Sequence, residues 1–182
     1  MGQDSRQSRG RIILLNGASS SGKSSIAREL QRRLPAPYLH FSIDHLRDSG
    51  ALPLERFRSG EFAWSEAREN FFVGFECAAA ALAGAGNNLI LDHIIEKREW
   101  SERLERVLAG FDVILVGVHC PLDELERREA ARGDRPHGDA RRDFSSVHRH
   151  CAYDIEVDGT QPPELNAAEI IEAMRRSRTR TS

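Results

Sequence analysis

A short aliphatic run that leads into a glycine- and serine-rich loop constrains this chain more than any other feature. The stretch reads IILLNGASSSGKSS, from Ile12 to Ser25. The aliphatic run is typical of a strand buried on both faces. The apolar spacing along Ser24–Leu34 predicts a helix that stops before Pro35. A flexible Gly/Ser linker would have no such neighbours. The stretch therefore predicts a strand, a tight turn and a helix, with the pattern G-x-x-x-x-G-K-[ST] at the turn.

The residue types of this loop suit bound phosphate. Phosphate oxygens need several backbone N–H groups directed at one point, and large side chains would block that approach. Lys23 is a cation able to reach β- and γ-phosphates, and Ser24 offers a hydroxyl to Mg²⁺. The alternative is a chance match in a serine-rich turn. We predict ATP and Mg²⁺ as cofactors, with the nucleotide bound by Gly17, Ala18, Ser19, Ser20, Ser21, Gly22, Lys23, Ser24 and Ser25.

Further aliphatic runs alternate with helical stretches along the chain. Strands are expected at residues 38–44, 87–94, 111–120 and 153–158. Helices are expected at residues 64–83, 98–108, 122–132, 140–151 and 164–176. Because strands that alternate with helices form parallel sheets covered on both faces, we expect an α/β fold of three layers with about five parallel strands.

One domain accounts for the whole organised part of the chain. A length of 182 residues suits a single domain. We expect it to span residues 11–177, with a small arginine-bearing lid at about residues 128–138. Polar residues 1–10 are expected to form a disordered tail, and residues 178–182 a flexible one.

The composition of the chain limits which partners and which cellular compartment we expect for it. A net charge of −2 with 30% charged residues gives no electrostatic case for nucleic acid or a membrane surface. No apolar run approaches the roughly 20 residues that span a bilayer, and the polar start is no secretory signal. The three cysteines include no CxxC pair, so we expect free thiols in a reducing cytoplasm. The oligomeric state stays open.

Two carboxylates are expected where predicted strands end. In parallel sheets, ligands bind beyond the carboxyl ends of the strands. Asp44 is expected to close the second strand, beside the strand of the phosphate loop, and Asp92 to close the third. Carboxylates near a triphosphate are costly unless they hold a metal or take a proton. Both are candidates for general base, substrate contact and organisation of Mg²⁺; the alternative for each is N-capping of the following helix.

An arginine-rich stretch, ERREAARGDR, spans the end of a predicted helix and a loop. Phosphoryl transfer spreads negative charge over the equatorial oxygens, and arginines that close over them stabilise that charge. We therefore predict Arg132 and Arg135 as catalytic lid residues, and Arg128 and Thr160 as nucleotide-binding. A solvated face with i,i+4 pairing is the alternative. The chain lacks NKxD and DxxG motifs, which argues against a GTPase switch and favours a small-molecule kinase.

The motifs together resemble the chloramphenicol phosphotransferase-like family of P-loop kinases. The likeness is carried by IILLNGASSSGKSS, FSIDHL, LILDHI, VILVGVHCPLDELERREAARGDR and YDIEVDGT, which follow the family's order and cover most of the chain. The resemblance implies transfer of the γ-phosphoryl of ATP to a hydroxyl of the antibiotic (3-O-phosphorylation), which confers resistance. It also implies that Asp44 is the base and that Arg132 and Arg135 face the phosphates.

The chain departs from the family pattern between Asp48 and Ala85, where the acceptor should bind. Phe57 and Phe62 are candidates for an acceptor pocket, whereas the helical spacing of Trp64, Phe71 and Phe75 favours core packing. Two other functions therefore stay open. One is a kinase of a cellular sugar, shikimate-like acid or nucleoside. The other is a nucleotide-binding regulatory module with little catalysis.

Overall fold

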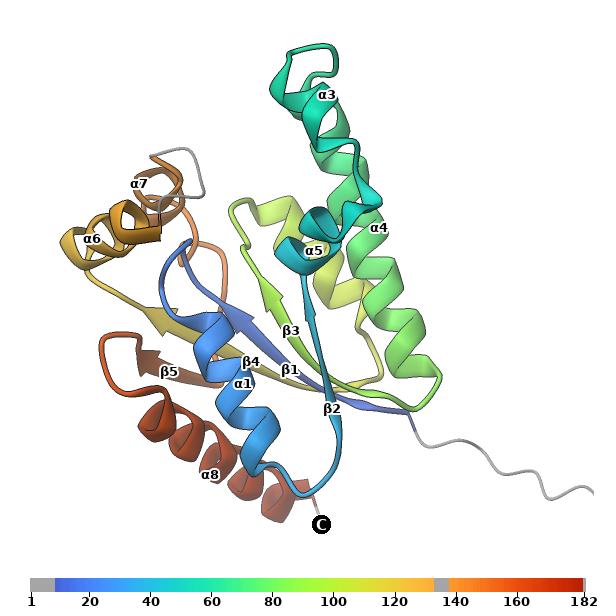
Figure 1. Ribbon diagram of the computed structural model, residues 1–182. Helices are drawn as coiled ribbons and strands as arrows, with labels where there is room; N and C mark the ends of the chain where they lie inside the picture. Colours follow the sequence, from blue (N-terminus) through green and yellow to red (C-terminus); the bar gives the residue numbers. More distant parts are fainter. Residues whose placement is uncertain (1–8, 133–137, 182) are drawn as a thin grey trace, which may run out of the picture.

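The computed structural model describes residues 9–132 and 138–181, in which five parallel strands form one sheet (Figure 1). The strands are β1 Arg11–Asn16, β2 Tyr38–Ser42, β3 Asn88–His93, β4 Asp112–His119 and β5 Ile155–Asp158. Their order across the sheet is β2-β3-β1-β4-β5, with every pairing parallel. The predicted α/β fold is confirmed.

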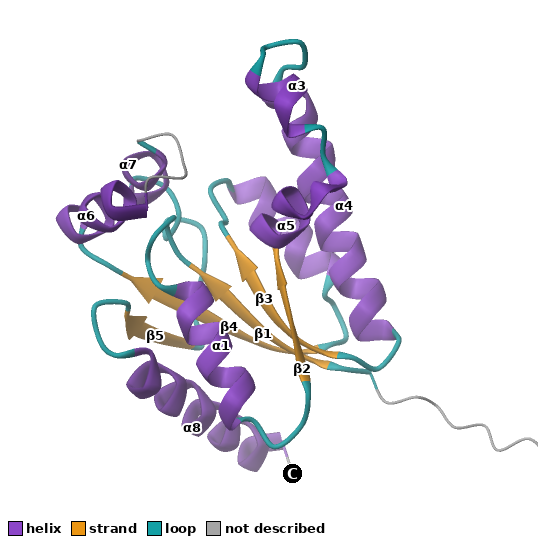
Figure 2. Cartoon of the chain, viewed as in Figure 1, coloured by secondary structure: helices purple, strands orange, loops and turns teal. Residues whose placement is uncertain are grey.

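Helices cover both faces of the sheet (Figure 2). One face carries α1 Lys23–Arg33 and α8 Pro163–Thr181, and the other carries α4 Trp64–Gly84 and α5 Arg98–Val107. Two helices lie beyond the carboxyl ends of the strands: α6 Leu122–Arg132 and α7 Asp139–Phe144. Between β2 and α4 the chain forms α2 Ile43–Leu46, the π-helical turn η1 Arg47–Ala51 and α3 Leu54–Arg58.

Successive side chains of β1 pack into two halves of the core, one on each face of the sheet. Ile12 and Leu14 pack with residues of α4 and α5, including Phe75 and Trp100. Ile13 and Leu15 pack on the opposite face, with residues of α1 and α8. Because successive side chains of a strand point to opposite faces, only an unbroken aliphatic run can bury both. Phe75 is fully buried and stacks on Phe41, as expected for core packing.

Two expectations about the second strand are wrong. β2 ends at Ser42, whose hydroxyl accepts the Asp44 N–H at 3.2 Å and caps α2, so Asp44 lies in a helix. A serine at this position favours a helix start over continued strand. In addition, β3 and not β2 lies beside β1. The fully buried Leu89, Ile90 and Leu91 suit β3 to this inner position.

The ends of several elements also differ from expectation. α7 stops at Phe144 and turns follow it, where the sequence predicts a helix to residue 151. The Ser145 hydroxyl donates to the Arg142 carbonyl at 2.8 Å, and such bonds compete with helix continuation. α8 continues to Thr181, into the expected C-terminal tail. Gly10, expected within the N-terminal tail, is buried and donates its N–H to the Ala83 carbonyl.

Among the described residues, every helix is too short or too polar to cross a bilayer.

Candidate active site

The phosphate loop connects β1 to α1 through a tightly constrained backbone. A Cβ on Gly17 would lie 2.6 Å from the Val118 carbonyl oxygen, so this position accepts only glycine. Gly22 has φ 102°, in the left-handed region that favours glycine. Ser20, with φ 66°, is the one non-glycine with positive φ in the part of the chain that the structure describes. Such a conformation persists only where the surroundings hold it.

Lys23 lies over this loop. Its side chain is buried, and Nζ donates to the carbonyl oxygens of Gly17 at 2.7 Å and Ala18 at 2.9 Å. Nζ also lies 3.8 Å from Asp92 Oδ1. The carbonyls and the carboxylate hold the ammonium over the loop that the sequence assigns to phosphate.

Asp92 lies within β3, one strand from the loop, and its carboxylate is buried. The Ser24 hydroxyl donates to Oδ2 at 2.9 Å, and His40 Nε2 lies 3.7 Å from the same oxygen. Burial favours the neutral acid, but Lys23, His40 and Ser24 together outweigh it and lower the pKa of Asp92. The carboxylate is therefore ionised beside the Ser24 hydroxyl. The helix-cap alternative is wrong for Asp92, because α5 begins at Arg98.

The Ser24–Asp92 pair fits a Mg²⁺ ion that is shared with a phosphate. Mg²⁺ takes oxygen ligands and is usually held by one or two carboxylates, waters and substrate phosphates. Within residues 9–132 and 138–181, no cluster of three or more His, Cys, Asp or Glu side chains is arranged to hold a metal alone. Any Mg²⁺ bound here would thus depend on the nucleotide for part of its ligands.

Asp44 lines the same cavity as Asp92. Its side chain is 30% exposed and forms an ion pair with Arg47 Nη2 at 3.2 Å. The cavity is lined by Ser19, Ser20, Ser21, Gly22, Lys23, Ser24, Ser25, Ile43, Asp44, Asp92 and Ile94. The structure therefore brings both predicted carboxylates and the phosphate loop together. Since Ser42 caps α2, the helix-cap alternative for Asp44 is wrong.

A second cavity of about 320 Å³ lies on the other side of the loop, between α6 and the start of α8. Arg128 reaches across it, donating to the Gly159 carbonyl at 3.0 Å and the Ser20 carbonyl at 3.4 Å. Glu124 accepts a hydrogen bond from Arg128 Nε at 2.6 Å. Arg128 thus joins the phosphate loop to the segment after β5, beside a space that suits the rest of a nucleotide.

Other predicted nucleotide contacts are placed differently or fall outside the structure. The Thr160 hydroxyl donates to Asp158 Oδ1 at 2.7 Å, within a turn. Thr160 is exposed and does not line the second cavity. Arg132 is the last residue of α6, and Arg135 lies outside the described residues. Their roles toward the phosphates stay predictions.

The candidate acceptor aromatics lie on an arm, formed by α3 and the start of α4, that projects beyond the sheet (Figure 1). The ring centroids of Phe57 and Phe62 are 5.6 Å apart, and Phe57 lies edge-on to Trp64 at 5.7 Å. Neither phenylalanine lines the cavity that holds Asp44. Their contact with an acceptor stays a prediction.

Three polar residues of this region whose side chains are buried were missed by sequence reasoning: Asn16, His40 and Asp143. Asn16 accepts the Ile95 N–H at 2.8 Å and donates to the Val147 carbonyl and the Tyr153 hydroxyl. An asparagine at the end of an aliphatic strand, directly before the glycine loop, was the available signal. His40 carries no comparable signal, because its partner Asp92 is distant along the chain.

Near the base of the loop, His148 stacks on His119 with ring centroids 3.9 Å apart, and its Nδ1 lies 2.7 Å from the Tyr153 hydroxyl. Burial, with a smaller contribution from His119, lowers the pKa of His148 from 6.5 to about 4. The folded protein therefore keeps this imidazole neutral at pH values where the unfolded chain protonates it.

This pKa predicts a pH-dependent loss of stability. Between pH 6.5 and about 4 the unfolded state binds more protons at His148 than the folded state. The free energy of unfolding should therefore fall as the pH falls through this window. His148→Gln should flatten this slope in urea unfolding over a pH series. Equal slopes for wild type and His148→Gln would contradict the assignment.

Comparisons with known proteins match most of the chain. The model of a family described as "Chloramphenicol phosphotransferase-like protein" matches residues 10–176. The chain is 34% identical over 175 residues to "Putative O-phosphotransferase MT2714" of Mycobacterium tuberculosis, covering 85% of this chain and 77% of the relative.

Solved P-loop kinases share the fold. The APS kinase CysC of Mycobacterium tuberculosis, in complex with AMPPNP and APS, superposes with a TM-score of 0.70 at 24% identity, covering 92% of this chain and 98% of the kinase. Shikimate kinase from Aquifex aeolicus superposes with a TM-score of 0.65 at 19% identity, again covering 92% and 98%. These likenesses establish the fold, while the acceptor is a separate question.

Proposed function

Because this chain belongs to the chloramphenicol phosphotransferase-like family, we propose that it transfers the γ-phosphoryl group of ATP to a hydroxyl of a small molecule in the cytoplasm. The leading acceptor is chloramphenicol or a related hydroxylated antibiotic, phosphorylated at the 3-hydroxyl. The observation that carries the proposal is one cavity that holds the phosphate loop, Lys23, the Ser24–Asp92 pair and Asp44.

Each residue of the site has its own proposed role in phosphoryl transfer. Backbone N–H groups of the loop and the Lys23 ammonium bind the phosphates. Ser24 and Asp92 would hold Mg²⁺, which neutralises charge on the phosphate oxygens when bound. Asp44 accepts the proton of the acceptor hydroxyl. The oxygen of that hydroxyl then bonds to the γ-phosphorus, while the bond between the γ-phosphorus and the ADP oxygen breaks. Arg128, Arg132 and Arg135 are proposed to support the nucleotide side.

A cellular metabolite is the second candidate acceptor, and the polar surroundings of the site favour it. Asp44, which lines the cavity, pairs with Arg47 Nη2 at 3.2 Å. Ion pairs of this kind suit a sugar or hydroxy acid better than an apolar acceptor.

The test is acceptor-dependent release of ADP. We expect slow ADP release from ATP and Mg²⁺ alone and a large increase with one acceptor class, measured over hydroxylated antibiotics, sugars, hydroxy acids and nucleosides. Mass spectrometry of the acceptor should show one added phosphate. ADP release that no acceptor changes would contradict a kinase and favour a regulatory module.

A further inference from the structure

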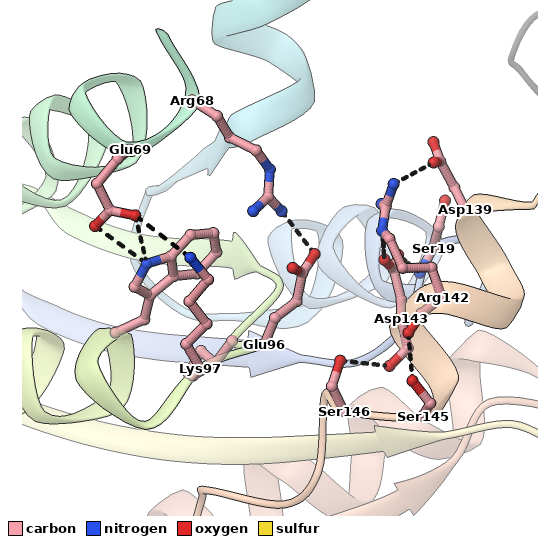
Figure 3. A network of polar contacts seen from close by, with 12 residues as sticks. Ser19, Arg68, Glu69, Glu96, Lys97, Asp139, Arg142, Asp143, Ser145 and Ser146 are labelled. Carbon is pink, nitrogen blue, oxygen red and sulfur yellow. Dashed lines mark hydrogen bonds and ion pairs between the residues drawn. The ribbon is translucent and has the colours of Figure 1, made fainter. Parts of the chain in front are cut away.

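A buried carboxylate outside the phosphate loop binds the backbone of the loop. Asp143, on α7, is fully buried, and its Oδ2 accepts the Ser19 N–H at 3.1 Å (Figure 3). Its other oxygen, Oδ1, pairs with Arg142 Nη2 at 2.9 Å. The two bonded residues are 124 positions apart in the chain. None of the functions assigned above uses this carboxylate.

The helix that carries Asp143 is itself held in place. The Glu129 carboxylate, on α6, accepts the backbone N–H groups of Gly138 and Ala140, each at 2.9 Å. Ala140 also packs in a small core with Leu125 of α6 and Ala18 of the loop. Asp143 is therefore presented to Ser19 from a helix joined to α6 by both hydrogen bonds and apolar contact.

The loop needs such support at the residue that follows. Ser20 has its φ of 66° directly after the Ser19 N–H that Asp143 binds, and its carbonyl accepts the hydrogen bond from Arg128. A strained backbone of this kind persists only where contacts on both sides hold it. Asp143 and Arg128 are the side-chain contacts on these two sides.

We propose that Asp143 is a positioning residue, which holds the phosphate loop in its anion-binding conformation by accepting the Ser19 N–H. This inference rests on the proposed nucleotide-binding function. The carboxylate binds the Ser19 N–H, and the Ser21 N–H donates within the loop to the Ala18 carbonyl at 3.2 Å. Arg142, bonded in turn to Asp139 at 2.7 Å, offsets the negative charge behind the loop.

Burial raises the pKa of Asp143 above its ordinary value, although Arg142 and the Ser19 N–H act in the opposite direction. Glu96, from the loop after β3, adds to the rise in pKa. Burying a charged carboxylate lowers the stability of the fold unless its hydrogen bonds and ion pairs offset the cost of desolvation.

Calorimetric titration with Mg·ADP, which requires no acceptor, tests the proposal. Asp143→Ala should weaken ADP binding by about 10- to 100-fold, the range for loss of a hydrogen bond to a charged group. Asp143→Asn keeps an oxygen that can accept the Ser19 N–H, so most of the affinity should return. Asp139→Ala is the matched control, because it removes a carboxylate of the same helix that binds Arg142 and not the loop.

The possible outcomes separate this inference from the proposed function. Wild-type affinity in Asp143→Ala overturns the positioning role alone, and so does Asp143→Asn as weak as Asp143→Ala. A wild-type protein that binds no ADP overturns the proposed function as well. If Asp143→Ala does not fold, hydrogen exchange of the unaltered protein decides. The Ser19 amide should exchange slowly without nucleotide, and fast exchange there overturns the proposal.

Discussion

Lys23→Ala is expected to lower kcat/KM for ATP by on the order of 10²- to 10³-fold, the range for loss of one charge-stabilising donor. The ammonium lies 2.7 Å from the Gly17 carbonyl oxygen, and alanine removes its charge from the loop. Steady-state kinetics and calorimetric titration with ATP and Mg²⁺ provide the measurement. Affinity and turnover that both match wild type would exclude a role for Lys23 in phosphate binding.

The chain offers a matched control for this substitution. Lys97 is its other lysine, and it lies exposed before α5. Lys97→Ala should leave both ATP binding and turnover unchanged. Thermal melting should accompany both variants, because Lys23→Ala also removes the neighbour of the buried Asp92 carboxylate. A folded Lys23→Ala protein with lost turnover would separate the chemical role from a structural one.

Asp44→Asn should preserve the fold and ATP binding and slow phosphoryl transfer by about 10²- to 10⁴-fold, the usual contribution of a positioned base. Asparagine keeps the shape of the side chain but cannot take the acceptor proton. Because Ser42 caps α2, the substitution leaves the cap intact. The measurement is single-turnover transfer to the acceptor that the ADP-release experiment identifies.

Asp48→Asn is the control for electrostatic effects. Asp48 binds Arg47 at 2.7 Å, so its loss disturbs the same arginine that pairs with Asp44. It does not line the cavity of the phosphate loop. Near wild-type transfer is expected for Asp48→Asn. If Asp44→Asn also transfers phosphate at that rate, Asp44 is not the base and the role passes to Asp92.

Much of the fold could be predicted because it is encoded by contiguous residues. The aliphatic run of β1, the glycine loop and the start of α1 are neighbours in the chain, so their order alone specifies a phosphate loop. The aliphatic runs likewise identify the strands, although some of their ends differ from the expected ones. The hydroxyl of Ser42 accepts the Asp44 N–H and ends β2 before Asp44. The pattern of apolar residues does not predict this hydrogen bond.

The partners of the loop were decided by the tertiary structure. The residue pattern of a buried strand is the same whichever strand lies beside it. The sequence therefore did not predict that β3 lies between β2 and β1. That placement brings Asp92 to Ser24, 68 positions away. The bond from Ser19 to Asp143 spans still more of the chain and depends on where α6 and α7 pack. Local residues therefore determined that the chain forms a phosphate loop, and long-range packing determined which carboxylates meet it.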